Sequence, residues 1–375
     1  MIIQGRHYRT GRLCEIVRQD GHIRAIGEPG LLTSDAKASW IGPALFDLQI
    51  NGGGGANFSS ARLKDEDVFR VVELCRQHGI GGFCPTLITQ CESTLKHGFR
   101  VLSQARREDR TMARAMPAFH LEGPYISSEE GPRGAHPLEH VRLPDWNEFQ
   151  RLQESAEGLI RLVTLAPELP GCLRFIERLN AAGCIVAIGH TAAPPSVICD
   201  AVHAGARLST HLGNGSHAFL PRHLNYLWEQ LDQDNLWASI ICDGCHLPAS
   251  LVRTFLKVKT PLRTILTCDA SSLAGLPPGD YREWEQDLRI LEDGCIIVRD
   301  SGFLAGSWHF TDACVGKFLQ MTGFDLATGI EMASSRPREL LGLPCAKLEV
   351  GAETDLMLFD WEPGGGIVVQ RLLTP

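Results

Sequence analysis

The sequence lacks any apolar run approaching the roughly 18 residues that a membrane-spanning helix needs. The first residues, Met1 to Arg9, contain no apolar stretch of the kind found in secretory signal peptides. Positive charge is not in excess, because 36 Lys and Arg residues face 44 Asp and Glu residues and the net charge is -8. We therefore expect a cytoplasmic protein with no general affinity for nucleic acid or membrane surfaces.

The sequence also lacks the regular pattern of a disulfide framework. Its 13 cysteines are an odd number, and several fall in expected core segments, among them Cys75, Cys84, Cys184 and Cys268. This distribution favours reduced thiols. With 375 residues, 44% of them hydrophobic, the chain can form one large domain with a small additional one.

The central part of the chain alternates between strand-like and helix-like segments. Helical spacing of apolar residues occurs, for example, between residues 64 and 78. Eight segments are predicted to be strands: 45–50, 82–87, 118–122, 159–165, one beginning at Ile185, 207–210, 238–243 and 264–268. Eight strands with intervening helices predict an α/β fold, a (β/α)8 TIM barrel.

Both ends of the chain consist of short strand-like segments separated by turns. A hairpin is predicted around Asp20-Gly21, and strands are predicted in 347–359 and 366–370. We predict a small β-sandwich domain formed from both chain termini, residues 1–43 plus 347–375. The barrel domain then comprises residues 44–346, with 275–305 as an inserted hairpin.

Four of the predicted strands end in residues that bind metals or transfer protons. Glu122, His190 and His211 form a set of two histidines and one carboxylate, which suits a divalent metal with one position open for water. Asp269 follows the last strand, where its carboxylate can take a proton from that water. Asp243 also ends a predicted strand, and the alternative to a role in the site is that it only anchors the loop after that strand. Other polar residues on this rim are His136, Asn214, Arg222 and His246.

Seven segments, in order over nearly the whole chain, carry a resemblance to a known family. They are His120-Leu-Glu-Gly-Pro-Tyr125, Thr164-Leu-Ala-Pro-Glu168, Gly189-His-Thr191, Thr210-His-Leu-Gly-Asn214, Asp243-Gly-Cys-His246, Cys268-Asp-Ala270 and Leu304-Ala-Gly-Ser307. The chain resembles the N-acetylglucosamine-6-phosphate deacetylase family of the amidohydrolase superfamily. The resemblance implies hydrolysis of the N-acetyl group of a phosphorylated amino sugar, foremost N-acetylglucosamine 6-phosphate.

The resemblance also implies roles for individual residues. Glu122, His190 and His211 would hold one divalent metal ion per chain, with zinc expected and iron or cobalt as alternatives. Asp269 would serve as general base and then general acid, and His136 would polarise the acetyl carbonyl. The substrate would be bound by Asn214, Gly215, His246 and, through its phosphate, by Arg222. In the family this arginine reaches across a dimer interface, so a homodimer is expected.

Two places depart from the family's pattern. Gln49 and Asn51 stand where many amidohydrolases carry a His-x-His pair for a second metal, and amides are poor metal ligands. We therefore predict a mononuclear site. The second place is the loop from Gly213 to His223, where small residues replace bulkier ones and His217 is added, which leaves the identity of the sugar open.

Two other functions compete with this interpretation. One is an amidohydrolase that acts on a different N-acyl or cyclic amide substrate. The segment Thr164 to Glu168 lacks the lysine that dihydroorotase-like enzymes often carry at this strand end, which argues against such chemistry. The other is a catalytically inactive binding barrel, and the presence of Asp269 and of all three candidate ligands argues against it.

Overall fold

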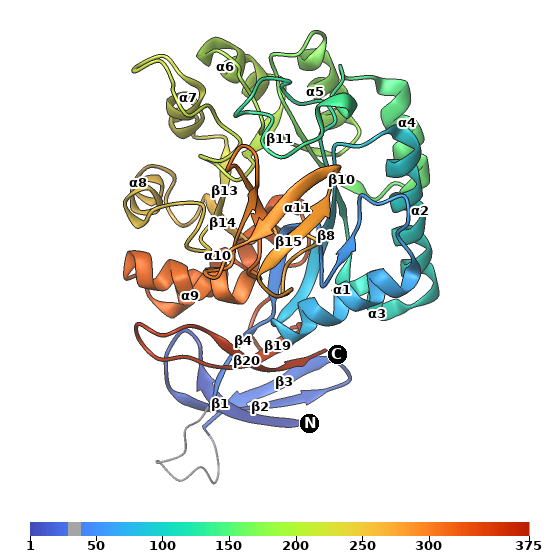
Figure 1. The fold of residues 1–375 in the computed structure, drawn as a ribbon. Coiled ribbons are helices and arrows are strands. Elements are labelled where there is room, and N and C mark those ends of the chain that lie inside the picture. Colours follow the sequence, from blue (N-terminus) through green and yellow to red (C-terminus); the bar gives the residue numbers. More distant parts are fainter. Residues whose placement is uncertain (29–38, 375) are drawn as a thin grey trace.

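The structure is a computed structural model, which describes residues 1–28 and 39–374. Its centre is a parallel barrel surrounded by helices (Figure 1). In sheet order the barrel strands are β14 (Thr264–Thr267), β13 (Trp237–Ile241), β12 (Ala206–Ser209), β11 (Ile185–Ile188), β10 (Ile160–Leu165), β9 (Phe119–Glu122), β8 (Ile80–Ile88) and β5 (Leu45–Ile50). The predicted (β/α)8 barrel is confirmed, because each strand pairs with its neighbour in chain order.

A buried carboxylate holds the seam between the first and last barrel strands. The backbone N–H of Asn51 donates to the backbone carbonyl of Ala270 at 2.9 Å, just beyond the ends of the two strands. Few other backbone contacts join these strands. Asp47 on β5 accepts hydrogen bonds from the hydroxyls of Thr267 and Thr311 and from the amide of Cys268. Burial raises the pKa of Asp47, against the opposing effect of these hydrogen bonds.

Helices cover the outside of the barrel. Their bounds are α1 (Asp65–Gln77), α2 (Glu92–Glu108), α3 (Arg110–Ala115), α4 (Trp146–Ser155), α5 (Cys172–Ala181), α6 (Pro195–His203), α7 (Tyr226–Asp232), α8 (Ala249–Lys259), α9 (Thr311–Thr322), α10 (Leu326–Met332) and α11 (Ser335–Leu341). Two of these helices, α4 and α7, begin at side-chain caps. Asp145 accepts from the amide of Asn147, and Asn225 accepts from the amide of Leu227. Within residues 1–28 and 39–374, no helix is both long and apolar enough to cross a bilayer.

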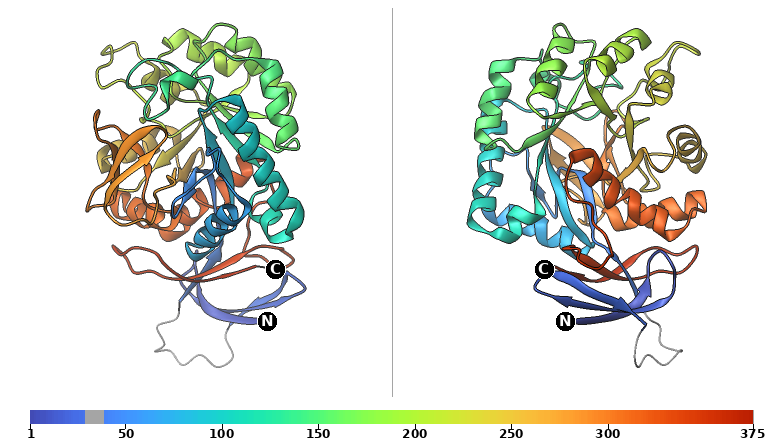
Figure 2. Two further views of the ribbon diagram at one scale, coloured as in Figure 1. Left: turned by 45° about the vertical axis from the view of Figure 1, so that its right-hand side comes forward. Right: turned by 180° about the vertical axis from the view of Figure 1, so that it is seen from behind.

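Strands from both chain ends form a second, smaller domain below the barrel, which also holds both termini (Figure 2). The sheet order is β20 (Val368–Leu373), β19 (Leu356–Asp360), β4 (Trp40–Pro43), β1 (Ile2–His7), β2 (Leu13–Gln19) and β3 (His22–Gly27). The predicted hairpin turn has φ of 49° at Asp20 and 77° at Gly21. The strands form one continuous sheet rather than the two sheets of a sandwich. The domain boundaries at residues 43 and 347 stay a prediction.

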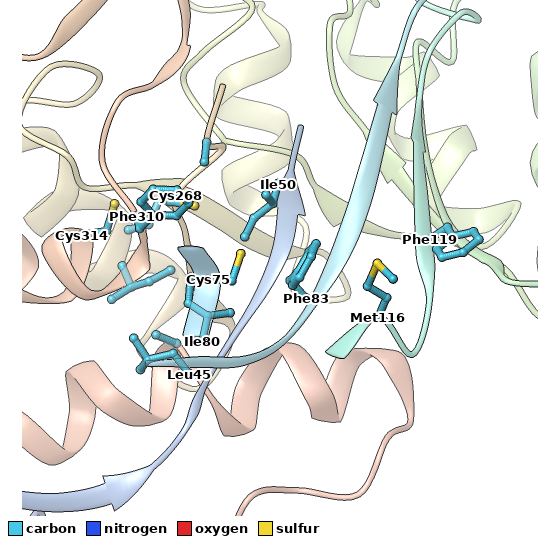
Figure 3. Close-up of a cluster of buried hydrophobic side chains, with 14 of the residues drawn as sticks. Leu45, Ile50, Cys75, Ile80, Phe83, Met116, Phe119, Cys268, Phe310 and Cys314 are labelled. Carbon is cyan, nitrogen blue, oxygen red and sulfur yellow. The ribbon is translucent and has the colours of Figure 1, made fainter. Parts of the chain in front are cut away.

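A large apolar core joins the helices to the barrel strands. It includes Leu45, Cys75, Ile80 and Phe83, which Figure 3 draws close together. A second cluster lies inside the barrel, with members from every barrel strand or its first flanking residue: Phe46, Leu48, Cys84, Ala118, Leu162, Ala187, Leu208, Trp237 and Ile265, together with Leu340 and Leu341. The interior is therefore packed, and polar chemistry is confined to the strand ends.

The segment predicted as an inserted hairpin is a four-stranded antiparallel sheet. Its strands are β15 (Gly279–Glu283), β16 (Gln286–Ile290), β17 (Cys295–Val298) and β18 (Leu304–Ser307). A separate apolar cluster packs this inserted sheet against Ile88, at the carboxyl end of β8. A short ribbon of β6 (Gly52–Gly53) and β7 (Ala56–Asn57) follows the first barrel strand. The inserted sheet thus lies at the end of the barrel where active sites occur.

Candidate functional site

The candidate residues lie at the carboxyl ends of barrel strands. Glu122 is the last residue of β9, whereas His190, His211 and Asp269 each lie two residues beyond β11, β12 and β14. These three have positive φ angles of 51°, 32° and 55°. Residues other than glycine rarely adopt this conformation, and the strained examples cluster at functional sites. The backbone at three strand ends is therefore held in a costly conformation beside one pocket.

Three of these side chains converge on a single point. Nε2 of His190 lies 3.3 Å from Oε1 of Glu122, and Nε2 of His211 lies 3.0 Å from the same oxygen. The two Nε2 atoms are 3.1 Å apart. Burial alone would raise the pKa of Glu122, but hydrogen bonds and charge from the two histidines hold it well below its usual range.

The donor set fits a divalent metal ion. Nδ1 of His190 lies 2.8 Å from the carbonyl of Pro132, and a carbonyl only accepts, so this nitrogen carries the proton. When Nδ1 carries the only ring proton, as metal binding through Nε2 requires, the Nε2 lone pair of His190 faces a carboxylate oxygen and a second imidazole nitrogen. Such a cluster of acceptors requires a proton or a cation between them, and histidine with carboxylate is a common ligand set for zinc.

His136 lies beside this cluster. Glu122, His136 and His190 offer ligand atoms that all lie within 4.8 Å of one another, and Nε2 of His136 is 4.0 Å from Oε2 of Glu122. Burial, followed by the charge of His190, lowers the pKa of His136 well below its usual value, so the imidazole is neutral near pH 7. Its Nδ1 contacts the hydroxyl of Thr89 at 2.8 Å, which fixes the ring.

Two amide side chains hold the carboxylate of Asp269. Asn51 donates to its Oδ1 at 2.7 Å and Gln49 at 3.0 Å, while Gln49 also lies 2.8 Å from Oε1 of Glu122. Burial, together with the negative charge of Glu122, raises the pKa of Asp269 to about 8. A carboxyl group with a pKa near neutrality is suited to accept and return a proton.

The candidate substrate-binding residues divide into two groups. Asn214, Gly215 and His246 line a pocket of about 230 Å³ together with the metal-site residues. Asp243 anchors the loop that carries His246, because its carboxylate contacts Nδ1 of His246 at 2.8 Å and the hydroxyl of Ser307 at 2.9 Å. This is the anchoring role weighed for Asp243 from the sequence.

Arg222 belongs to the second group. It is exposed and does not line the pocket of its own chain. On the same loop His223 is exposed, whereas His217 is half-buried and contacts Glu129 at 3.1 Å and the hydroxyl of Tyr226. Arg222 is therefore not brought to the metal site within one chain.

The expectation that all cysteines are reduced is wrong for one pair. Cys245 and Cys295 form a disulfide that joins the loop after β13 to β17 of the inserted sheet. The other eleven cysteines are free. The two partners are 50 positions apart, and nothing in the sequence spacing distinguishes them from the other cysteines. The disulfide adjoins His246 and links the substrate-side loop to the inserted sheet.

Several residues at the site were not singled out from the sequence as pocket or anchoring residues. The inserted sheet contributes Trp284, Phe303 and Leu304 to the pocket. Glu168 accepts from the amide of Ala192 and from the hydroxyl of Thr191, both at 2.6 Å, and so fixes the segment that follows His190. For Gln49 and Asn51 the sequence signal was the absence of histidine, which does not reveal their contact with Asp269.

Comparison with known proteins places this geometry in context. No protein-family model matches the chain. The chain is 36% identical over 338 residues to N-acetylglucosamine-6-phosphate deacetylase of Bos taurus, covering 85% of this chain and 79% of the relative. It is 29% identical over 360 residues to N-acetylgalactosamine-6-phosphate deacetylase of Escherichia coli O157:H7, covering 94% and 91%.

A solved structure supports the same relationship. An aspartate-to-alanine variant of N-acetyl-D-glucosamine-6-phosphate deacetylase from Mycobacterium smegmatis, in complex with N-acetyl-D-glucosamine-6-phosphate, superimposes with a TM-score of 0.86 at 28% identity, over 97% of this chain and 95% of that one. The barrel, the strand-end site and these relatives define a hydrolase that acts on carbon–nitrogen bonds. The fold is also similar to that of an enamidase described as a member of the amidohydrolase superfamily, with a TM-score of 0.52 at 15% identity. Within that class, the chain belongs to the N-acetylglucosamine-6-phosphate deacetylase family.

Proposed function

We propose that the protein hydrolyses the acetamide of N-acetylglucosamine 6-phosphate and releases acetate and glucosamine 6-phosphate. The observation that carries this proposal is the convergence of Glu122, His190 and His211 on one point, with the carboxyl group of Asp269 beside it. The relatives that share this fold are named for the same reaction, and the Mycobacterium smegmatis structure contains that substrate.

Glu122, His190 and His211 are the proposed ligands of one divalent ion, with zinc favoured and iron or cobalt as alternatives. A divalent ion bound there polarises the substrate carbonyl and lowers the pKa of water. His136, neutral and fixed by Thr89, is proposed to donate a hydrogen bond to the acetyl oxygen. Gln49 and Asn51 occupy the positions of a second metal's ligands and instead hold Asp269, which supports a mononuclear site.

Asp269 is proposed to perform both proton transfers. Both amide hydrogen bonds from Asn51 and Gln49 end on Oδ1, which leaves Oδ2 to exchange a proton. In the first step the carboxylate takes a proton from the attacking water. In the second it returns that proton to the amide nitrogen, so that the amine can leave. The raised pKa of Asp269 supports this exchange, since a carboxyl group of ordinary acidity would be a weaker base.

Substrate recognition is proposed to involve two chains. His246, Asn214 and the backbone at Gly215 face the sugar from one chain. Arg222, which lies outside its own pocket, is proposed to bind the 6-phosphate in the site of a second copy. The loop of Arg222 supports a homodimer, because Phe219 is 94% exposed and Leu224 75% exposed. Large apolar side chains at such exposure favour burial against a partner.

A second candidate substrate is N-acetylgalactosamine 6-phosphate. The Escherichia coli relative named for that sugar matches a larger share of this chain than the Bos taurus relative does, although at lower identity. A cytoplasmic location is also proposed, and the eleven free cysteines support it.

The decisive experiment measures acetate release by the zinc-loaded protein from a panel of amino sugars. The panel contains N-acetylglucosamine, N-acetylgalactosamine and N-acetylmannosamine, each with and without the 6-phosphate. Dihydroorotate, a cyclic amide without an acetyl group, is tested separately by its loss of ultraviolet absorbance on ring opening. We expect the highest kcat/KM for N-acetylglucosamine 6-phosphate. Equal activity on the phosphorylated and unphosphorylated sugars would refute the sugar-phosphate assignment, and absence of acetate release from every sugar would refute the deacetylase activity.

A further inference from the structure

The tip of the β15–β16 hairpin has an unusual combination of sequence and backbone conformation. Trp284 and Glu285 connect the two strands, and their φ angles are +51° and +59°. Two-residue hairpin turns with positive φ at both positions strongly favour Asn-Gly. A tryptophan and a glutamate in these positions are therefore held by contacts made elsewhere.

Those contacts attach the tip to loops at the mouth of the barrel. Asn57 donates to Oε2 of Glu283 at 2.8 Å, from the short ribbon that follows β5. Gln286 donates to the carbonyl of Ala135 at 2.6 Å, in the long loop that follows β9. The residues on both sides of Trp284 and Glu285 are thus fixed to the rim of the site, and the strained turn has a defined position.

Trp284 contributes an apolar wall to the active-site pocket. Its side chain is 7% exposed, lines the pocket and belongs to the same apolar cluster as Ile88. Ile88 also lines the pocket, and it pairs in register with Glu122 on the neighbouring strand. The indole Nε1 is buried and has no hydrogen-bond partner among the residues that the structure describes. This wall is therefore adjacent to the proposed metal site.

The polar wall of the pocket lies across the barrel mouth. Asn214 and Ser216 follow β12, which is four strands away from β8 in the eight-stranded barrel. When an amide substrate is bound between the two walls, its hydroxylated sugar faces the polar wall and its acyl group faces the apolar wall. The acyl methyl is the apolar end of such a substrate, so it matches the wall of Trp284 and Ile88.

We propose that Trp284 is a specificity-determining residue, whose indole packs against the acyl methyl and limits the length of the acyl chain. This inference rests on the proposed deacetylase function. The test compares kcat/KM for N-acetyl-, N-propionyl- and N-butyrylglucosamine 6-phosphate in the wild type and in Trp284→Gly. Glycine adopts positive φ without strain, so this variant removes the indole without straining the turn.

In Trp284→Gly the ratio of kcat/KM for propionyl over acetyl substrate is expected to rise at least about tenfold, the size of one methylene's discrimination in an apolar pocket. Trp284→Phe, which keeps a smaller ring, is expected to give an intermediate ratio. Leu288→Ala is the matched control, because Leu288 is fully buried in the same cluster and does not line the pocket. It should leave the ratio unchanged.

An unchanged ratio in Trp284→Gly with normal metal content would overturn the inference, as would an equal rise in Leu288→Ala. A uniform loss of kcat/KM for all three substrates would also contradict it, since that result assigns Trp284 to the sugar or to the fold. Failure of the proposed function is distinguishable, because then the wild type itself releases no acetate from the N-acetyl substrate.

Discussion

Asn51 donates a hydrogen bond to Asp269 across 2.7 Å, and the two residues are 218 positions apart in the chain. The side-chain amide of Asn51 therefore restrains the carboxylate of the proposed base. Gln49 makes a parallel contact to the same oxygen at 3.0 Å. Gln49 and Asn51 thus bear on two properties of the site. As amides they are poor ligands for a second metal ion, and as hydrogen-bond donors they orient the carboxylate of Asp269.

The protein is predicted to bind one metal ion per chain. Elemental analysis of the purified protein should give close to one equivalent, and His211→Ala should lose most of it. Asn51→Ala is the matched control, since it removes a neighbour of the site without removing a proposed ligand. Two tightly bound equivalents, both needed for activity, would contradict the mononuclear assignment.

Asp269→Asn is predicted to keep the metal and to lower kcat by about 10² or more, the usual effect of removing a general acid–base group. The amide retains the shape of the side chain but cannot take up the proton of the attacking water. Metal content and kcat are measured on the same preparation. Turnover near the wild-type rate would assign the proton transfers to another residue.

The metal-free protein should show a pH-dependent effect of Asp269 on stability. The pKa of Asp269 is raised from its ordinary value of 3.8 to about 8, so the folded state binds this proton more tightly than the unfolded state. The contribution of the proton to stability is full below pH 3.8 and is lost as the pH rises toward 8.

Urea unfolding of wild type and Asp269→Asn, both in chelator, tests this expectation. Between pH 5 and pH 8 the free energy of unfolding of the wild type should fall relative to that of the variant, because asparagine does not titrate. Added zinc should diminish the difference, since a cation favours the carboxylate. A difference that does not change with pH would show that burial does not raise this pKa.

Arg222→Ala should weaken use of the phosphorylated substrate by about 1.5–3 kcal/mol, the value of one hydrogen bond to a charged group, with KM most affected. Unphosphorylated N-acetyl sugars should change little. Because Arg222 lies outside its own pocket, mixing Arg222→Ala with Asp269→Asn should restore activity. Each mixed dimer then has one site that combines an intact base with an intact arginine. Absence of restoration in verified mixed dimers would place the phosphate contact within one chain.

Asp47→Ala should lower the free energy of unfolding by about 3 kcal/mol or more, because it leaves several buried donors at the barrel seam without an acceptor. Asp200→Ala, at an exposed position on α6, is the control and should change stability by no more than about 0.5 kcal/mol. Equal stability of the two variants would show that the seam is held by its backbone contacts.

The barrel could be predicted from the sequence because its strands and helices are encoded locally. Each strand is a short apolar run, and parallel strands bring their carboxyl ends to one face of the barrel. The sequence alone therefore groups four strand-end residues at one site: Glu122, His190, His211 and Asp269. The family resemblance then supplied the expected roles. Gly275, Pro277 and Pro278 indicated an inserted hairpin, and the turns that add β17 and β18 were missed.

Other features depend on contacts between distant segments. The bond between Asn51 and Asp269 and the disulfide between Cys245 and Cys295 join positions that no local pattern relates. Trp284 was missed for a different reason, because its turn lacks the glycine or asparagine that marks a hairpin in a sequence. The exposure of Arg222 follows from the path of a loop, which spacing alone does not determine.

The position of β4 in the terminal sheet constrains the order in which the protein can be completed during translation. β4 lies between β1, from the start of the chain, and β19, near its end. It also leads directly into β5, the first barrel strand. During translation, the edge of β4 that later pairs with β19 therefore stays unpaired until Leu356–Asp360 leaves the ribosome. The unpaired N–H and C=O groups of such an edge can form hydrogen bonds with other chains. A truncation before Leu356 would make that transient exposure permanent.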